Sequence, residues 1–278
     1  MPHQSYAVSL GARLPTQFED NITLQLPQAR ASTMVTLRAS IQLNKILSEV
    51  MGYLYSAGTV RRPWSDIQIA ISQLNTRLAN WRSALPLMLL LDPDTGGEKS
   101  PLPERMYFQL RYFSTRMMIN RPCLFDLHQK NTIPSQSTAS KQDDRDSASL
   151  CVSSARGLIR LFPDEPDIIA LYRSTPWWCV LHYIIQARAV LVLEIGFNAS
   201  HVSDEMDILI QDACKVLKWL QKLSNTTLSA YRAWIAMSRI LNLSTLRVGR
   251  NTAYIAHLLP SSTSVPPSDQ MGGLGPIY

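Results

Sequence analysis

The strongest constraint on the fold is an almost unbroken apolar run from residue 177 to residue 197, WWCVLHYIIQARAVLVLEIGF. As a helix it is long enough to cross a bilayer. However, it contains His182, Arg188 and Glu194, and each of these side chains is costly in hydrocarbon. A helix that is apolar on nearly every side and does not suit lipid must be enclosed by other helices. The run therefore predicts the central helix of a helical bundle, and we expect no membrane span.

The composition agrees with a packed domain. The chain has 278 residues, of which 46% are hydrophobic and only 17% are charged. This apolar content is sufficient for a sizeable core, and the charge is too low for a disordered chain. The net charge of +6 forms no dense basic run, so we expect only weak attraction to polyanions.

Helical spacing of apolar residues recurs along most of the chain, and no segment shows the alternation typical of a strand. The clearest stripe has an alternating four-and-three spacing and consists of Ile67, Ile71, Leu74, Leu78 and Trp81. Further amphipathic segments are 32–55, 104–120, 146–162, 203–220 and 227–246. The sequence thus predicts an all-α fold, a single bundle of about seven helices.

Composition also divides the chain into segments. Residues 1–30 lack apolar periodicity and are expected to form an extended arm. Residues 31–259 are expected to form one helical domain, interrupted at 128–145 by a mobile loop that is rich in Ser, Thr, Gln and charge. Residues 260–278 are rich in Ser, Pro and Gly and are expected to be a disordered tail.

Two helix boundaries follow from local signals. The residue before a proline is disfavoured in the helical region, so Arg121 and Pro122 are expected to end the third helix. Asp146 and Ser147 are expected to cap the next helix, which would end near Phe162.

Common catalytic and metal-binding motifs are missing from the sequence. The cysteines at 123, 151, 179 and 214 are too far apart for a zinc site or a redox dithiol, which require closely spaced thiolates. No pair of histidines has the spacing of a metalloprotease, and there is no glycine-rich phosphate loop or nucleophile elbow. We therefore expect no enzyme activity, no cofactor, no metal and buried, reduced thiols.

One acidic cluster leaves an alternative open. Asp143, Asp144 and Asp146 could hold Mg²⁺ for a diphosphate substrate, as such clusters do in all-helical isoprenoid diphosphate cyclases and lyases. The cluster lies at the edge of the polar segment with Arg145 among the carboxylates, and this favours a solvated loop that caps a helix.

A bundle of this kind leaves clefts between helices, and a few large or polar side chains could line them. The candidate cleft-lining residues are Trp177, Trp178, His182, Arg188 and Trp234. Each is first a candidate for the core, because aromatic side chains and hydrogen-bonded histidines occur there more often than in ligand sites.

Three stretches resemble the middle homology region, the regulatory domain of fungal zinc binuclear cluster transcription factors. They are GARLPTQFEDNITLQLP (11–27), FSTRMMINRPCL (113–124) and YRSTPWWCVLHYIIQARAVLVLE (172–194). The short runs 218–220 and 231–234 are similar to further "W-L" and "R-A-W" elements of that region. The resemblance covers most of residues 11–246.

The resemblance implies an all-helical domain that regulates transcription in the nucleus without catalysis. It also implies clefts that receive a small-molecule effector or a protein partner, and homodimerisation is a further expectation. The family binds DNA through six closely spaced cysteines, which four scattered cysteines cannot provide. We therefore expect DNA contact only through a module that is absent from this chain, as in a truncated or free-standing form of such a factor. A non-functional remnant is a third reading, and it predicts poor solubility.

The first residues, MPHQSY, have neither a basic region nor an apolar run. A secretory signal is therefore not expected. This agrees with an intracellular, nuclear protein.

Overall fold

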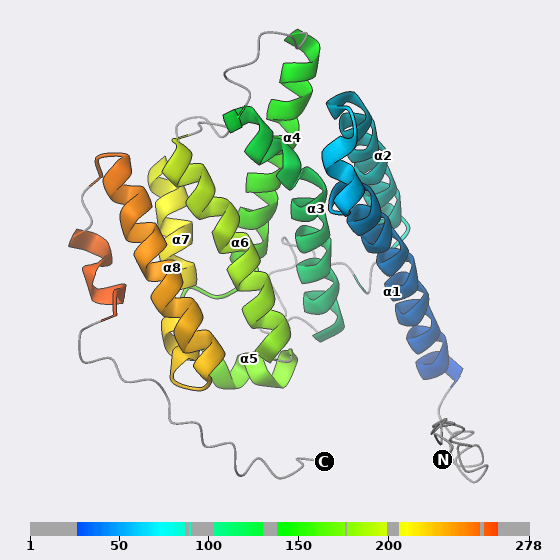
Figure 1. The fold of residues 1–278 in the computed structure, drawn as a ribbon. Helices are drawn as coiled ribbons and strands as arrows, with labels where there is room; N and C mark the ends of the chain where they lie inside the picture. The colour runs from blue at the N-terminus through cyan, green and yellow to red at the C-terminus, as the bar shows by residue number, and fades with distance from the viewer. Residues whose placement is uncertain are drawn as a thin grey trace, which may run out of the picture. The chain divides into compact units, whose positions relative to one another are not determined.

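The computed structural model describes residues 27–86, 89, 103–129, 138–175, 177–198, 206–250 and 253–260. The chain divides into two compact units, residues 1–41 and 42–278. Of the first unit, the structure describes the beginning of helix α1, which continues into the second unit (Figure 1). The contacts discussed below all lie within the second unit.

The described residues form eight α-helices and two short 3₁₀-helices, with no strand among them. In order they are α1 (Pro27–Leu54), η2 (Ala57–Arg61), α2 (Trp64–Ser83), α3 (Pro103–Gln129), α4 (Thr138–Arg160), α5 (Ile168–Ser174), α6 (Trp177–Phe197), α7 (Met206–Ser224), α8 (Leu228–Arg247) and η5 (Ala253–Leu258). The prediction of an all-α fold is confirmed.

Helix α6 lies at the centre of the second unit, in contact with α3, α4, α7 and α8 (Figure 1). Its buried side chains point in several directions around the helix: Ile184 and Leu191 lie on one face, and Leu181, Val190 and Val192 lie to either side of it. By length and hydropathy Cys179–Phe197 would suit a membrane, but 56% of that stretch is buried inside the bundle. The apolar run is thus the enclosed helix that its sequence predicts.

The most extensive helix pair is formed by α3 and α4. A glycine permits this close approach: a Cβ atom added to Gly157 of α4 would lie 2.5 Å from Cε1 of Phe113 of α3. Only hydrogen fits at this position, so the glycine is required by packing.

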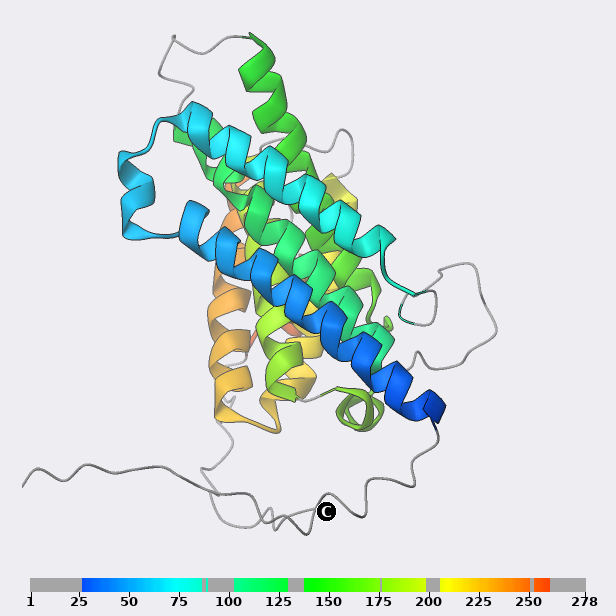
Figure 2. The same cartoon turned by 90° about the vertical axis from the view of Figure 1, so that its right-hand side faces the viewer.

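Helices α2 and α3 run side by side (Figures 1 and 2). The apolar stripe of α2 is buried as predicted, with Ile67, Ile71, Leu74, Leu78 and Trp81 in the core. Between the helices, Asn75 and Asn120 exchange two amide hydrogen bonds of 2.8 and 3.0 Å. This pairing satisfies the amide of Asn120, which is fully buried.

The last two long helices also follow their sequence signals. Helix α7 buries Leu209, Ile210, Ala213, Val216, Leu217 and Leu220. Helix α8 starts directly after Thr227, whose side-chain oxygen accepts a hydrogen bond from the amide of Ala230 at 3.2 Å. Such a cap satisfies a backbone donor at the helix start that would otherwise lack a partner.

The prediction that Arg121 and Pro122 end the third helix is wrong, because α3 continues to Gln129 with Pro122 inside it. A proline within a helix leaves the carbonyl four residues earlier without its amide donor. Here that carbonyl belongs to Met118, and the hydroxyl of Tyr55 donates to it at 2.7 Å. A side chain from the residue directly after α1 thus replaces the missing amide.

The expected mobile loop at 128–145 is also wrong for the residues that the structure describes. Helix α3 covers 128 and 129, and helix α4 already begins at Thr138, so 138–145 are helical. Asp146 and Ser147 lie inside α4 and do not cap it. Residues 130–137 lie outside the described part of the chain.

The buried face of α4 explains why this polar segment folds as a helix. Asp144, Ala148, Cys151 and Ala155 are all buried, and they recur at intervals of four and three residues. Within 138–145 the stripe contributes only Asp144, so this segment shows no apolar periodicity of its own.

Other predicted boundaries are tested only in part. Residues 27–30, which were expected in the extended arm, belong to helix α1, whereas 1–26 lie outside the described residues. The expected tail is described only at Pro260. Between α4 and α6 the structure adds a short helix, α5, capped by the carboxylate of Asp167, which accepts from the amide of Ala170 at 3.0 Å. The assignment of 31–259 to one domain stays a prediction.

Candidate functional site

The five side chains proposed to line a cleft do not meet at one place in the described structure. The side chains of Trp177 and Trp178 lie outside the described part. His182 is exposed on α6, where its ring packs edge-on against Tyr183 at 5.4 Å between centroids. Arg188 and Trp234 are buried in the core.

Arg188 connects three helices from inside the bundle. From α6, its Nη1 donates to the carbonyl of Ala213 on α7 at 2.6 Å, and Nη2 donates to the carbonyl of Met237 on α8 at 2.9 Å. Its Nε has no partner among the described residues. Burial lowers the pKa of Arg188 to about 10, although Cys214 acts in the opposite direction. Arg188 is therefore a buried residue that links α6 to α7 and α8, and it does not line an open cleft.

Trp234 anchors the segment that follows α8. Its Nε1 donates to the carbonyl of Leu258, at the end of η5, at 3.0 Å. Next to this anchor is a hollow of about 500 Å³, which we call the α8 hollow. It is lined by Tyr231, Ile235, Ser238, Arg239, Asn242, Leu259 and Pro260. Trp234 thus positions the wall of this hollow without lining it.

A second hollow, of about 530 Å³, lies along α2 and α4, and we call it the α2–α4 groove. Nine of its thirteen lining residues carry a hydroxyl, amide or carboxylate group: Ser65, Gln68, Ser72, Asn75, Thr76, Asp143, Asp144, Asp146 and Ser147, together with Cys123, Ile69, Ile71 and Leu150. Its volume is within the range of small-molecule sites. The many donors and acceptors suit a polar molecule, and the carboxylates favour a neutral or cationic one over an anion.

Asp144 connects the walls of the α2–α4 groove. Its side chain is only 1% exposed, and its carboxylate accepts from Trp64 Nε1 at 3.1 and 3.0 Å and from Gln68 Nε2 at 2.7 Å. The thiol of Cys123, on α3, lies 3.7 Å from Oδ1. The carboxylate thus joins α4 to α2 and α3.

The acidic cluster does not assemble as a metal site in the described structure. Asp143 and Asp146 are exposed, and Asp146 accepts from the amide of Gln142 at 2.8 Å. Among the described residues no group of three or more His, Cys, Asp or Glu side chains could hold a metal ion. The oxygens of Asp144 face N–H donors, which is the environment of a structural carboxylate.

Sequence reasoning did not find either hollow. The α2–α4 groove is lined by polar residues that look like an ordinary solvent-exposed helix face. One available signal was the position of Asp144, in helical register with Ala148 and Cys151, which indicates an acid on a buried face.

The thiols are arranged as core residues. Cys123 and Cys151 are buried, Cys179 and Cys214 are partly buried, and none of the four forms a disulfide. Burial raises the pKa of Cys151 to about 12; Arg121 lowers it and Glu194 raises it further. A thiol with such a pKa stays protonated near neutral pH and is a poor nucleophile.

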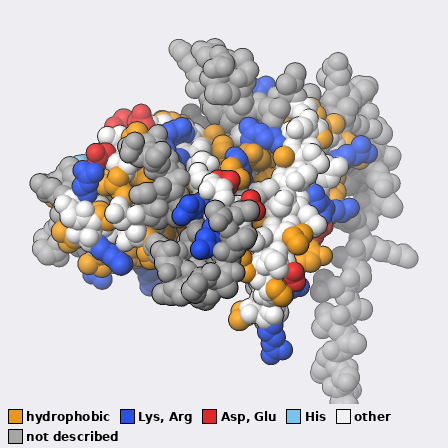
Figure 3. Space-filling model, turned by 90° about the horizontal axis from the view of Figure 1, so that it is seen from above, with side chains coloured by type: hydrophobic (Ala, Val, Ile, Leu, Met, Phe, Trp, Pro, Cys, Tyr) orange, Lys and Arg blue, Asp and Glu red, His pale blue; other side chains and the backbone are white. Residues whose placement is uncertain are grey.

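The surface is mixed in character. Seen from above, basic side chains are scattered among apolar and neutral ones (Figure 3). This agrees with the modest net charge of +6.

Comparison with known proteins gives one informative relative. The chain is 26% identical over 276 residues to a protein of Aspergillus niger named "Transcription regulator galc". The match covers 88% of this chain and 33% of the relative, so the chain spans about a third of the relative's length. No family model and no solved structure matches the chain. Most of the chain is therefore similar to part of a fungal protein named as a transcription regulator.

Proposed function

We propose that this chain is a transcription-regulatory domain that responds to a small-molecule effector or a protein partner and catalyses no reaction. The observation that carries the proposal is the similarity of 88% of the chain to part of a transcription regulator. The enclosed helical bundle and the local resemblance to a fungal regulatory domain support it.

The α2–α4 groove is the proposed entry point of an effector. A ligand shifts a protein between two arrangements only by its different affinity for them. The hydrogen bonds from Trp64 and Gln68 to Asp144 link the two helices that line this groove. A molecule that competes for Asp144 would change how α2 packs on α4, and this provides a physical route from binding to a response.

DNA contact in this proposal belongs to a module outside this chain. The four cysteines are dispersed over four helices, α3, α4, α6 and α7, and cannot form a two-zinc cluster. The relative is three times as long as the matched region, which leaves ample length for such a module there. Action in the nucleus and homodimerisation are parts of the proposal.

A reporter experiment tests the proposal. The full chain is fused to an unrelated DNA-binding domain and expressed in a fungal host with a reporter gene under the matching operator. We expect reporter output to differ at least several-fold from that of the DNA-binding domain alone. Equal output from both proteins, with equal amounts in the nucleus, would contradict a regulatory role.

The groove is tested in the same assay by the substitution Ser72→Trp, which fills it from α2. Thr76→Ala, at the same groove, is a control that removes little volume. We expect Ser72→Trp to change the reporter response and Thr76→Ala to leave it nearly unchanged. If neither variant changes the response, the effector does not enter through this groove.

No observation favours the alternative of an isoprenoid diphosphate cyclase, since the oxygens of Asp144 bind indole and amide donors. Incubation of the purified chain with farnesyl diphosphate and Mg²⁺ tests it directly. A hydrocarbon product would overturn the non-catalytic proposal.

A further inference from the structure

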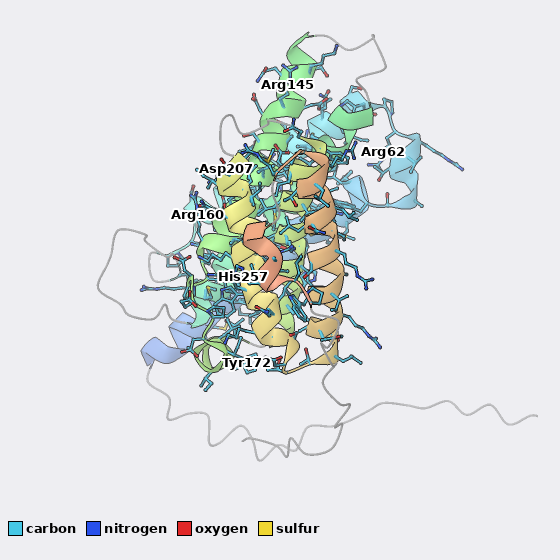
Figure 4. All side chains as sticks on the ribbon, turned by 90° about the vertical axis from the view of Figure 1, so that its left-hand side faces the viewer. Arg62, Arg145, Arg160, Tyr172, Asp207 and His257 are labelled. Carbon is cyan, nitrogen blue, oxygen red and sulfur yellow. The ribbon has the colours of Figure 1, made fainter. Side chains whose placement is uncertain are left out.

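The side of α8 that faces away from α6 and α7 exposes a row of large apolar side chains. Ile240, Leu243 and Leu246 are 44%, 66% and 54% exposed. Residues three apart lie next to each other on a helix surface, so the three form one continuous strip. Figure 4 views the molecule from the side on which α8 and η5 lie.

The same side of α8 is strongly basic. Helix α8 contains Arg232, Arg239 and Arg247, all exposed, and its sequence has no acidic residue. Within the described part of the chain, no carboxylate forms an ion pair with these three arginines. Arg250, just beyond the helix, differs in this respect because it pairs with Asp207 at 3.3 Å. We define the α8 outer face as Arg232, Arg239, Ile240, Leu243, Leu246 and Arg247.

The α8 hollow adjoins this face, because Arg239 belongs to both. Its walls include the apolar side chains Ile235 and Leu259 and the ring of Tyr231. A hollow of about 500 Å³ is large enough to receive an aromatic or branched side chain of a partner. The α8 outer face thus combines an apolar strip, a rim of cations and an adjacent recess, as protein-binding surfaces do.

We propose that the α8 outer face docks an acidic amphipathic helix of a partner protein. The apolar strip requires an apolar surface to cover it, and the arginines require carboxylates around that surface. A second copy of this chain docked symmetrically would bring arginines against arginines, and like charges oppose such an interface. A nucleic acid would satisfy the arginines but would leave the leucines without an apolar partner.

The dimensions of the face set the size of the partner helix. From Arg232 to Arg247 the helix advances about 22 Å, at about 1.5 Å per residue. A partner helix of about 15 residues covers this length, with leucine-like residues on one side and glutamates on both flanks. This inference goes beyond the proposed function and does not depend on it, since it concerns binding alone.

The test uses the full 278-residue chain and a fluorescein-labelled 16-residue peptide. The peptide carries leucines at helical spacing and glutamates at the flanking positions, and a peptide of the same composition in scrambled order is the control. Fluorescence anisotropy is expected to show micromolar binding of the amphipathic peptide and at least tenfold weaker binding of the scrambled one.

Charge-reversed variants locate the site. The double substitution Arg239→Glu with Arg247→Glu is expected to weaken binding at least tenfold, because attraction becomes repulsion at two places. The matched control is Arg61→Glu with Arg145→Glu, which changes the net charge equally. Both arginines are exposed; Arg61 ends η2 and Arg145 lies on α4, where Figure 4 labels it. The control is expected to change binding less than twofold, and circular dichroism verifies that both variants are folded.

Several results would overturn this inference. They are the absence of peptide binding, equal binding of the scrambled peptide, or an equal loss in the control variant. Stronger binding of a 20-base-pair duplex, abolished by the α8 substitutions, would assign the face to nucleic acid. A dimer in sedimentation that Leu243→Glu dissociates would assign it to a second copy. The assay involves no transcription, so its failure and a failed reporter experiment are distinguishable.

Discussion

The hydroxyl of Tyr55 is the feature that allows a proline inside α3, and this makes a sharp prediction. Pro122 leaves the Met118 carbonyl without an amide donor, and Tyr55 supplies the replacement at 2.7 Å. Burial raises the pKa of Tyr55 above its ordinary value, so the phenol remains a donor throughout the neutral range. Tyr55→Phe removes this hydrogen bond and changes little else.

The size of the effect follows from the exposure of the site. An unsatisfied buried carbonyl costs about 1–3 kcal/mol. Tyr55 is 39% exposed, so water partly replaces the hydroxyl, and we expect Tyr55→Phe to lower the free energy of unfolding by about 1 kcal/mol. Pro122→Ala restores the amide and is expected to stabilise the protein by about 1–3 kcal/mol.

A double-mutant cycle in urea tests the explanation. In the Pro122→Ala background the new amide satisfies Met118, so Tyr55→Phe should then cost less than about 0.3 kcal/mol. The reasoning fails if Tyr55→Phe is equally costly in both backgrounds, because the hydroxyl would then act independently of the proline.

Three further substitutions test the interior. Arg188→Met should raise the free energy of unfolding by about 1–3 kcal/mol, because burial of the charged arginine is costly. This cost is visible in its pKa, which burial lowers to about 10, and a tenfold change in a protonation equilibrium is worth about 1.4 kcal/mol. A lower stability of the variant in urea would mean that the hydrogen bonds of Arg188 outweigh its desolvation. Gly157→Ala should lower the thermal midpoint despite the better helix propensity of alanine, whereas Gly52→Ala, with open space around its Cβ, should raise it by the equivalent of about 0.5–1 kcal/mol; parallel shifts would refute the packing argument. Asp144→Ala should cost about 2–4 kcal/mol by leaving buried donors unpaired, and its exposed neighbour Asp143→Ala less than about 0.5 kcal/mol; comparable losses would remove the special role of Asp144.

Most of the fold could be predicted from the sequence because apolar residues at helical spacing mark the helices of a bundle. The stripe of α2 is buried as predicted, and α8 spans Leu228–Arg247, close to the predicted 227–246. The errors arose where a contact distant in sequence outweighed a local signal. Pro122 does not end α3, because the hydroxyl of Tyr55, 67 positions earlier in the chain (122 less 55), donates to the Met118 carbonyl that the proline leaves without an amide donor. The polar segment at 138–145 is helical because Asp144 finds donors on α2.

The candidate site was predicted less well, for a physical reason. Large aromatic and charged side chains draw attention in a sequence, but they can also be enclosed in the core when their polar atoms find partners there, as the hydrogen bonds of Arg188 and Trp234 to backbone carbonyls show. The α2–α4 groove is lined instead by serine, threonine and amides. Such residues also cover ordinary surfaces, so only their convergence in space distinguishes a groove.

The sheltered position of α6 has a consequence for biosynthesis. The ribosome completes this helix at Phe197, but one of the helices that cover it, α8, ends only at Arg247. At about 5–20 residues per second, the intervening fifty residues take between about 2.5 and 10 s to synthesise. During this interval α6, whose hydropathy would suit a membrane, is exposed on the side that α8 later covers. Chaperones or the membrane-targeting machinery can therefore bind α6 during this interval. In a truncated chain that ends before α8, this side of α6 would stay exposed.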